Sequence, residues 1–495
     1  MNGEQVARHQ VAIVWLRRAL RLADHPALSA AVAEADAVVP AFVLERRADA
    51  AWPDGAASRW WTGRSLEAFS ASLKERGAGL VVREGDAAAV LSALAHECGA
   101  TAVYCERRYE PDLAAADDRV AATLERAGGV LRAHNCSLLN EPDVPRTAAG
   151  GPFKVFTPYF NACSNLPLSD LPLRAPDRIP APPVLPRGID LEARTGALGG
   201  APQNPGTYWQ PGEAGALAHA AQFFSEAAAD YETDRDRPDR FGTSRLSPHL
   251  AFGEIGPRQL LVEARELARR GGAHPAAAGA RALVRQLYWR EFAYHLLHHF
   301  PHTTECPLRP EFASFPWVDD AVGFEAWKAG HTGYPIVDAG MRELLATGWM
   351  HNRVRMIVAS FLTKDLLIPW QHGAHYFWDR LVDADLANNT LGWQWVAGSG
   401  ADAAPFFRVF NPVLQGEKYD PEGTYVRTWV PELSRLPNRW LHRPWEAPAA
   451  VLADAGVSLD ETYPARIINH SEARTRALAA YASIRGDGAS GRGRS

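Results

Sequence analysis

The segment TSRLSPHLAFGE (243–254) combines hydroxyl groups, a guanidinium and a predicted helix start. Ser247 before Pro248 favours a helix with the serine as N-cap and the proline at its first position. Three polar residues stand directly before this start: Thr243, Ser244 and Arg245. Backbone N–H groups at a helix N-terminus attract anions, and the hydroxyls and the guanidinium add further donors. The segment therefore indicates either a phosphate or pyrophosphate site or a plainly capped helix.

The segment WMHNRVRM (349–356) carries two arginines within two turns of a predicted helix. Arg353 and Met356 share one face of that helix because they are three residues apart, whereas Arg355 points elsewhere. Two interpretations stay open. Either both arginines are solvated charges, or one contacts a phosphate while the other pairs with an internal carboxylate.

The segment LVDADLANNTLGWQW (381–395) places two carboxylates, Asp383 and Asp385, among weakly polar neighbours. Paired carboxylates serve acid–base catalysis, metal binding or recognition of the N–H edge of a ligand. Helix capping by Asp385 is the alternative explanation.

Two histidines, His295 and His299, have a spacing that suits a metal ion on one helix face. No HExxH motif and no neighbouring carboxylate completes a ligand set. We therefore expect a structural role for both histidines and no metal in the protein.

The chain also contains 16 tryptophans. A large aromatic core explains such a surplus, and so does redox or stacking chemistry; composition alone favours the core. With 52 basic and 57 acidic side chains the net charge is −5, so no general attraction to nucleic acid exists. If DNA is the partner, a local patch must hold its phosphates.

Cysteine usage and hydropathy indicate the compartment. The five cysteines form no CxxC pair, which is typical of reduced thiols and not of a disulfide framework. The first residues lack the apolar core of a signal peptide, and no 18-residue apolar run occurs. We expect a soluble, cytoplasmic protein.

The chain is predicted to contain an α/β domain followed by a linker and an all-helical domain. Over residues 1–134, short β-branched runs alternate with helical patterns, which predicts a doubly wound parallel sheet. The predicted strands are 11–16, 37–44, 79–82, 102–105 and 129–134. No GxGxxG motif follows the first strand and no GxxxxGK[ST] motif occurs, so dinucleotide-binding and P-loop interpretations lose support.

The remainder of the chain is predicted to be a linker and an all-helical domain. Residues 135–212 are rich in proline, which cannot continue helices or central strands, so they form a long irregular connector. Residues 213–485 have helical apolar spacing, and 486–495 is a Gly/Ser/Arg-rich flexible tail. Four aromatic residues suggest that the connector packs on a surface: Phe153, Phe156, Tyr159 and Phe160.

Several motifs in order along the chain carry a family resemblance. They are TSRLSPHLAFGE, WREF (289–292), TGYPIVDAGMREL (332–344), GWMHNRVRM (348–356), DADLANN (383–389), GWQWVAGSGADAAPFFRVFNP (392–412) and YVRTWVPEL (425–433). Together they resemble the photolyase/cryptochrome family, and within it the bacterial cyclobutane pyrimidine dimer (deoxyribodipyrimidine) photolyases. The resemblance implies an α/β antenna domain, a linker and a helical FAD-binding domain.

The resemblance also implies roles for the cofactor site. Asp385 accepts from the isoalloxazine or ribityl edge, Arg355 pairs with Asp383, and Asn389 faces flavin N5, where many signalling cryptochromes have Asp or Cys. The implied cofactor-binding residues are Tyr231, Thr243, Ser244, Arg245, Leu246, Ser247, Asn352, Arg355, Asp383, Asp385 and Asn389. A second antenna chromophore, a folate or a deazaflavin, stays undecided, and Glu110 is a possible contact for it.

For catalysis the resemblance implies that excited reduced flavin donates an electron to a pyrimidine dimer, whose ring opens before the electron returns. The implied electron chain is Trp393, Trp370 and Trp317. The implied catalytic residues are Gln286, Trp289, Asn352, Met356, Asn389 and Trp395. The implied DNA contacts are Arg235, Trp289, Arg353, Trp395, Arg408 and Gln415. The partner is then damaged DNA, and the protein is expected to be a monomer.

Two departures from the family pattern bear on function. Gln286 stands where cyclobutane-dimer photolyases usually have Glu, and Gln cannot carry a charge or lend a proton. Gln is common there in the (6-4) and animal cryptochrome branch, but that branch has histidines at the positions of Asn352 and Met356. The signature WLRRALRLADHPAL (15–28) is also altered at Leu16, Ala19 and His25.

The leading hypothesis is therefore a light-driven photolyase. The alternative is a cryptochrome-type blue-light receptor with weak or no repair activity, which Gln286 favours. A flavoprotein electron carrier without DNA is a third hypothesis, and lesion-selective, salt-sensitive DNA binding would exclude it.

Overall fold

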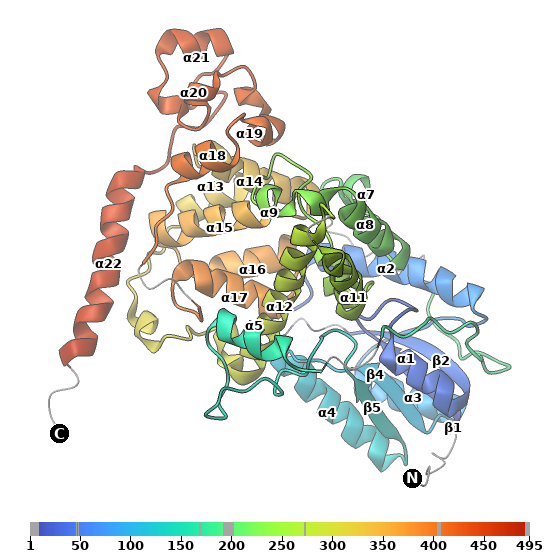
Figure 1. Ribbon diagram of the computed structural model, residues 1–495. Helices are drawn as coiled ribbons and strands as arrows, with labels where there is room; N and C mark the ends of the chain where they lie inside the picture. The colour runs from blue at the N-terminus through green and yellow to red at the C-terminus, as the bar shows by residue number, and fades with distance from the viewer. Residues whose placement is uncertain are drawn as a thin grey trace.

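The structure is a computed structural model that describes residues 9–45, 47, 49–167, 171–191, 202–271, 274–402 and 407–490, with side chains to residue 485. Figure 1 shows an α/β domain, drawn in blue and cyan, next to a larger helical domain, drawn in green to red. The predicted fold class, a doubly wound parallel sheet followed by an all-helical domain, is confirmed.

The first domain is built on a parallel sheet of five strands in the order β3-β2-β1-β4-β5. The strands are β1 (His9–Leu16), β2 (Ala35–Leu44), β3 (Val81–Glu84), β4 (Ala102–Glu106) and β5 (Val130–His134). The helices are α1 (Pro26–Glu34), α2 (Ala56–Glu75), α3 (Ala87–Cys98) and α4 (Pro111–Arg126). Each predicted strand is present, with ends shifted by up to two residues.

The strands are continuous apolar runs because helices cover both faces of the sheet. On β1, Val14 packs on the face with α1 and α2, whereas Ile13 packs on the face with α3 and α4. The strand order reverses between β1 and β4, and in open α/β sheets the loops at the carboxyl ends meet at that point. Here the loop after β1 contacts the helical domain.

The connector packs as its aromatic residues predict. Phe153, Phe156 and Tyr159 are buried in one cluster with Tyr288 and Phe292. Its described residues contain two helices, α5 (Phe156–Ser164) and α7 (Pro205–Tyr208). The parts of the connector numbered 168–170 and 192–201 lie outside the described residues.

The helical domain follows. Its helices are α8 (Glu213–Ser225), α9 (Tyr231–Asp234), α10 (Ser247–Ala251), α11 (Pro257–Arg269), α12 (Ala277–His299), α13 (Ala321–Ala329), α14 (Pro335–Thr347), α15 (Asn352–Ser360), α16 (Trp370–Arg380), α17 (Leu386–Ala397), α18 (Pro412–Tyr419), α19 (Thr424–Trp429), α20 (Asn438–Leu441), α21 (Ala449–Ala455) and α22 (His470–Ser490). None of the helices in the described ranges has the length and apolar character needed to cross a membrane.

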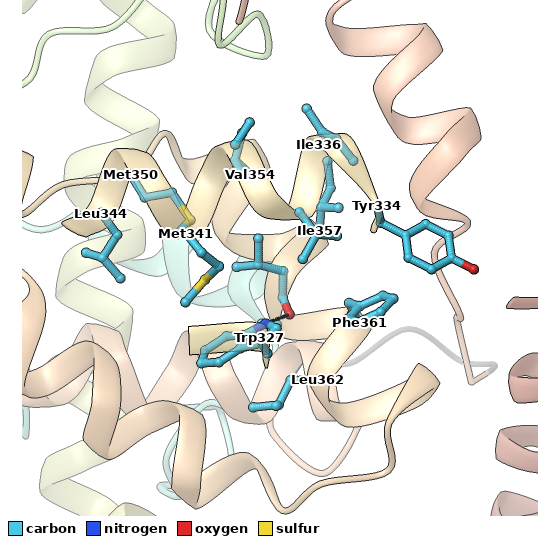
Figure 2. Close-up of a cluster of buried hydrophobic side chains, with 14 of the residues drawn as sticks. Trp327, Tyr334, Ile336, Met341, Leu344, Met350, Val354, Ile357, Phe361 and Leu362 are labelled. Carbon is cyan, nitrogen blue, oxygen red and sulfur yellow. Dashed lines mark hydrogen bonds between the residues drawn. The ribbon is translucent and has the colours of Figure 1, made fainter. Parts of the chain in front are cut away.

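The core of this domain surrounds Trp327, whose indole Nε1 donates to the carbonyl of Val358 at 2.9 Å (Figure 2). Gly340 lets α14 approach α15, since a Cβ there would lie 2.4 Å from Val354. A hydrogen bond from the C-terminal helix, His470 Nδ1 to Asp365 Oδ1 at 2.5 Å, holds α22 against the domain. That helix continues to Ser490, past the predicted domain end at 485, and residues 491–495 lie outside the described part.

Candidate functional site

The segment 243–247 differs in one detail from its predicted geometry. Helix α10 begins at Ser247 itself, and its N-cap is Leu246, which makes no side-chain capping bond. The prediction of Ser247 as N-cap is therefore wrong by one position. Proline is tolerated throughout a first helical turn because the first N–H groups have no intrahelical partner, so Pro248 does not fix the start to a single residue. The Ser247 hydroxyl accepts instead from the indole of Trp349 at 3.1 Å.

Arg245 is the cation of this segment. Its guanidinium lies over the rings of Phe241, at 4.5 Å, and Trp349, at 5.0 Å. Burial lowers its pKa, and no carboxylate lies within ion-pair distance of it in the described part of the chain. Because α10 has only five residues, its macrodipole is small and Arg245 supplies most of the positive charge. A partly buried guanidinium that forms no ion pair in the described residues, beside hydroxyl groups, fits a pyrophosphate.

The two carboxylates of the segment 381–395 have different partners. Asp385 does cap α17: one oxygen accepts from the backbone N–H of Asn388 at 2.9 Å, and the other accepts from the Tyr294 hydroxyl at 2.5 Å. Asp383 accepts from Arg355 at 2.8 Å through Oδ2. Its Oδ1 is buried and has no hydrogen-bond partner among the described residues. The predicted pairing of Arg355 with Asp383 is thus present. The resemblance assigns the acceptor for the flavin edge to Asp385, but both oxygens of Asp385 have protein donors, and the free buried acceptor belongs to Asp383.

A buried acceptor without a donor is costly, so such an atom in a folded protein indicates a missing partner. A flavin presents N–H and hydroxyl donors of the required kind. The residues at this site therefore fit FAD: Arg245 for its phosphates and Asp383 for a donor on its edge.

The two arginines of α15 both form ion pairs. Arg355 also donates to the carbonyl of Met350 at 2.7 Å, so it is the internal partner that one interpretation required. Arg353 pairs with Asp236 at 2.8 Å, approaches the Met356 sulfur at 3.8 Å and lies 4.5 Å over the Tyr419 ring. Arg353, one of three arginines predicted to contact DNA, is therefore paired with a carboxylate.

Helices α16 and α17 carry two of the three predicted electron-transfer residues, Trp370 and Trp393. The Asn389 side-chain NH2 donates to the carbonyl of Ala374 at 3.0 Å, which leaves its oxygen available as an acceptor. Trp393 is buried against Gly373, the residue before Ala374. Trp370 is buried one turn away at the start of α16.

The third predicted member of the electron chain, Trp317, is only partly buried and packs on Phe315, with ring centroids 4.4 Å apart. The three tryptophans thus range from the buried core to the surface.

The predicted pocket walls lie on two helices. Trp289 on α12 is partly exposed and stacks on Phe156 at 3.7 Å with an interplanar angle of 7°. Trp395, near the end of α17, is also partly exposed and lines a cavity with Arg408, Arg309 and Phe410.

Other predicted residues lie around these elements. Gln286 is half-buried one turn before Trp289, and Asn352 is exposed at the start of α15. Gln415 is half-buried on α18. Arg235 lies 5.5 Å over the ring of the buried Tyr231. Of the anion segment, Thr243 and Ser244 are half-buried.

The expected structural role of the histidines is supported. His295 bonds through both ring nitrogens, to the Pro142 carbonyl at 2.7 Å and to the Phe153 N–H at 3.0 Å. Both ring nitrogens of His295 thus bond to the connector. The described residues contain no group of side chains suited to a metal ion.

Glu110, the possible antenna contact, pairs with Arg108. Burial raises the pKa of Glu110, but the guanidinium of Arg108 outweighs this effect and holds the pKa at about 2.

Sequence reasoning missed three partners: Asp236 for Arg353, Tyr294 for Asp385, and Arg18, which donates to the carbonyl of Ala384 at 3.0 Å. Of these only Arg18 lies in a segment that had a signal, the signature 15–28. The remaining two are fixed by tertiary packing alone.

Comparisons with known proteins agree with this geometry. Residues 12–182 match the DNA photolyase family, and residues 283–483 match the FAD binding domain of DNA photolyase. A deoxyribodipyrimidine photo-lyase of Agrobacterium fabrum is 46% identical over 96% of this chain and 98% of its own. Cryptochrome-1 of Arabidopsis thaliana is 37% identical over 94% of this chain and 69% of its own.

Among solved structures, a bacterial class III photolyase from Agrobacterium tumefaciens matches with a TM-score of 0.91 and 44% identity, covering 98% of this chain and 99% of that one. The matches span both domains and bear out the expected resemblance. The protein is a flavoenzyme with FAD as its cofactor, and it belongs to the DNA photolyase/cryptochrome family.

Proposed function

We propose that the protein repairs cyclobutane pyrimidine dimers in DNA by light-driven electron transfer. The observation that carries the proposal is the packing of α16 on α17. Asn389 and Trp393 of α17 contact Ala374 and Gly373, which are consecutive residues of α16. Trp370 lies one turn before them, at the start of α16. An amide for the flavin and two buried indoles are thus supported by the same two helices.

FAD, bound and reduced, supplies the electron that opens the dimer when blue light excites it. Arg245 and the hydroxyls of Thr243 and Ser244 bind the phosphates. Asp383 accepts from the flavin edge through its free oxygen, while Arg355 fixes its orientation through the other oxygen. Asn389 presents its amide oxygen because its NH2 is held by Ala374.

The tryptophans supply electrons from the surface. Trp317 is partly exposed, whereas Trp370 and Trp393 are buried, so an electron enters at Trp317 and passes inward. This order gives the tryptophan surplus a use beyond packing.

Lesion recognition rests on aromatic stacking and local cations. A dimer must leave the duplex to react, which costs a few kcal/mol, and stacking on an aromatic residue returns about 1–3 kcal/mol per base. Trp289 and Trp395 are the proposed walls, with Gln286, Asn352 and Met356 as polar and sulfur contacts. Because the net charge is −5, the DNA phosphates depend on a local set of residues: Arg235, Arg353, Arg408 and Gln415. Arg353 contributes to this set only when its ion pair with Asp236 opens.

Binding in the dark tests the lesion pocket. We expect the wild type to prefer a duplex with one thymine dimer over the intact duplex, and we expect Trp395→Ala to reduce that preference while binding to intact duplex persists. Equal affinity of the wild type for both duplexes would contradict the proposal.

A cryptochrome-type receptor is the second candidate because Gln286 lacks the charge of the usual Glu. The variant Gln286→Glu separates the two. A photolyase keeps measurable repair with either side chain, whereas a receptor repairs with neither.

A further inference from the structure

Arg18 lies in the loop after β1 and reaches from the α/β domain into the helical domain. Its guanidinium Nη1 donates to the carbonyl of Ala384 at 3.0 Å and to the carbonyl of Ala251 at 3.2 Å. Ala384 stands between the two aspartates Asp383 and Asp385. One side chain thus joins two segments that are far apart in the helical domain's sequence.

These two segments are the ones to which the proposed function assigns the flavin. Ala251 is the last residue of α10, and Arg245 stands just before the start of that short helix. Asp383 carries the buried acceptor without a partner. The guanidinium of Arg18 therefore sets the distance between the phosphate-binding segment and the segment that meets the flavin edge.

The backbone of Arg18 is hydrogen-bonded to the sheet of the α/β domain. Its backbone N–H donates to Glu106 Oε2 at 3.0 Å, and the backbone N–H of Ala19 donates to the same oxygen. Glu106 is buried at the end of β4, next to β1 in the sheet. The guanidinium also lies 5.0 Å over the ring of Phe252. The backbone at Arg18 is thus fixed at the point where the strand order of the sheet reverses, and Phe252 supports its side chain.

We infer that Arg18 is a positioning residue for FAD, so that the α/β domain is a structural part of the flavin site. The inference rests on the proposed function, which places the flavin between these two segments. Arg21 gives the contrast: it also crosses the domain boundary, donating to the carbonyls of Gly253 at 2.8 Å and Cys136 at 2.8 Å. None of its hydrogen bonds in the described residues reaches the segment 383–385.

The adjacent residue provides a matched control. Arg17 pairs with Asp117 and lies 4.3 Å over the Trp15 ring, so its contacts stay within the α/β domain. Arg17→Ala removes the same charge and the same side-chain volume as Arg18→Ala. Arg18→Lys keeps the charge, but its ammonium ends short of the position of Nη1 and it lacks the planar group that lies over Phe252.

The test measures FAD affinity in the full chain, by titrating the apoprotein and following flavin fluorescence. A hydrogen bond from a charged donor corresponds to about a tenfold change in affinity when it is lost. We expect FAD to bind about tenfold more weakly to Arg18→Ala, with an altered fine structure in the flavin absorption band. The FAD affinity of Arg18→Lys should lie between those of Arg18→Ala and the wild type. Arg17→Ala should bind FAD like the wild type.

Thermal unfolding of the apoproteins separates positioning from general damage, and Arg18→Lys keeps the test valid if Arg18→Ala does not fold. The inference is overturned if both Arg18 variants bind FAD with wild-type affinity and spectrum. It is also overturned if Arg17→Ala weakens FAD binding as much as Arg18→Lys does. Failure of the proposed function is distinguishable, because the wild type would then bind FAD normally and repair no dimer.

Discussion

Gly373→Ala tests the contact between α16 and the buried tryptophan of the electron chain. A Cβ at position 373 would lie 2.1 Å from Cη2 of Trp393 and 2.5 Å from its Cζ3. To restore ordinary van der Waals separation, the indole or the helix has to move by roughly 1 Å or more. Trp393 is only 3% exposed, so no open space receives it.

The free energy of unfolding has two opposing contributions. Alanine in a helix interior is favoured over glycine by about 1 kcal/mol. Overpacking a well-packed core costs about 1–3 kcal/mol. We therefore expect Gly373→Ala to lower the free energy of unfolding by up to about 2 kcal/mol, and to slow light-driven reduction of the flavin because Trp393 is displaced.

Gly392→Ala on α17 is the matched control, since a Cβ there meets no atom within 4 Å. Its free energy of unfolding should rise by up to about 1 kcal/mol, and its flavin should be reduced in light at the normal rate. Urea unfolding and the rate of flavin reduction in blue light, with an external reductant, measure both effects. If the two variants are equally stable and reduce flavin equally fast, the packing described for Trp393 is refuted.

Three further predictions concern charged residues. Asp236→Asn frees Arg353 from its 2.8 Å ion pair, so binding to intact DNA should tighten and its salt dependence should steepen by about one phosphate contact; an unchanged salt slope would refute this. Asp383→Asn leaves Arg355 without its carboxylate and should cost up to about 3 kcal/mol in chemical unfolding, since the arginine keeps partial exposure. Burial raises the pKa of Glu343 from 4.5 to about 7, so the folded protein binds this proton more tightly than the unfolded chain does. The resulting stability is fully present below pH 4.5 and is lost as the pH rises through 7. The stability of Glu343→Gln relative to wild type should therefore increase from pH 5 to pH 8, and a constant difference would contradict the assignment.

The sequence predicts the sheet well because burial on both faces makes each strand a continuous apolar run. β1 illustrates this: Val14 and Ile13 face opposite layers and both are fully buried. The predicted packing of the connector follows from Phe153, Phe156 and Tyr159, which an unpacked tether would leave exposed. Helix ends are less certain, as Ser247 shows, because a proline is accepted at more than one position of a first turn.

The site is predicted only in part. The pairing of Arg355 with Asp383 came from the family resemblance, and the capping by Asp385 from local pattern. The bonds from Tyr294 to Asp385 and from Arg353 to Asp236 span 91 and 117 residues. Periodicity assigns a residue to a helix face but does not identify the distant segment that packs there. The free oxygen of Asp383 likewise cannot be predicted from sequence, because it is identified only once all hydrogen-bond donors around that carboxylate are known.

Light-driven repair is the most direct test of the central proposal. Photoreduced protein is mixed with an oligonucleotide that contains one thymine dimer, and intact thymines are counted after blue light and after darkness. We predict recovery of intact thymines in the light alone, with more recovery in Gln286→Glu than in the wild type. If the flavin reduces normally and the dimer persists with both proteins, the repair function is contradicted.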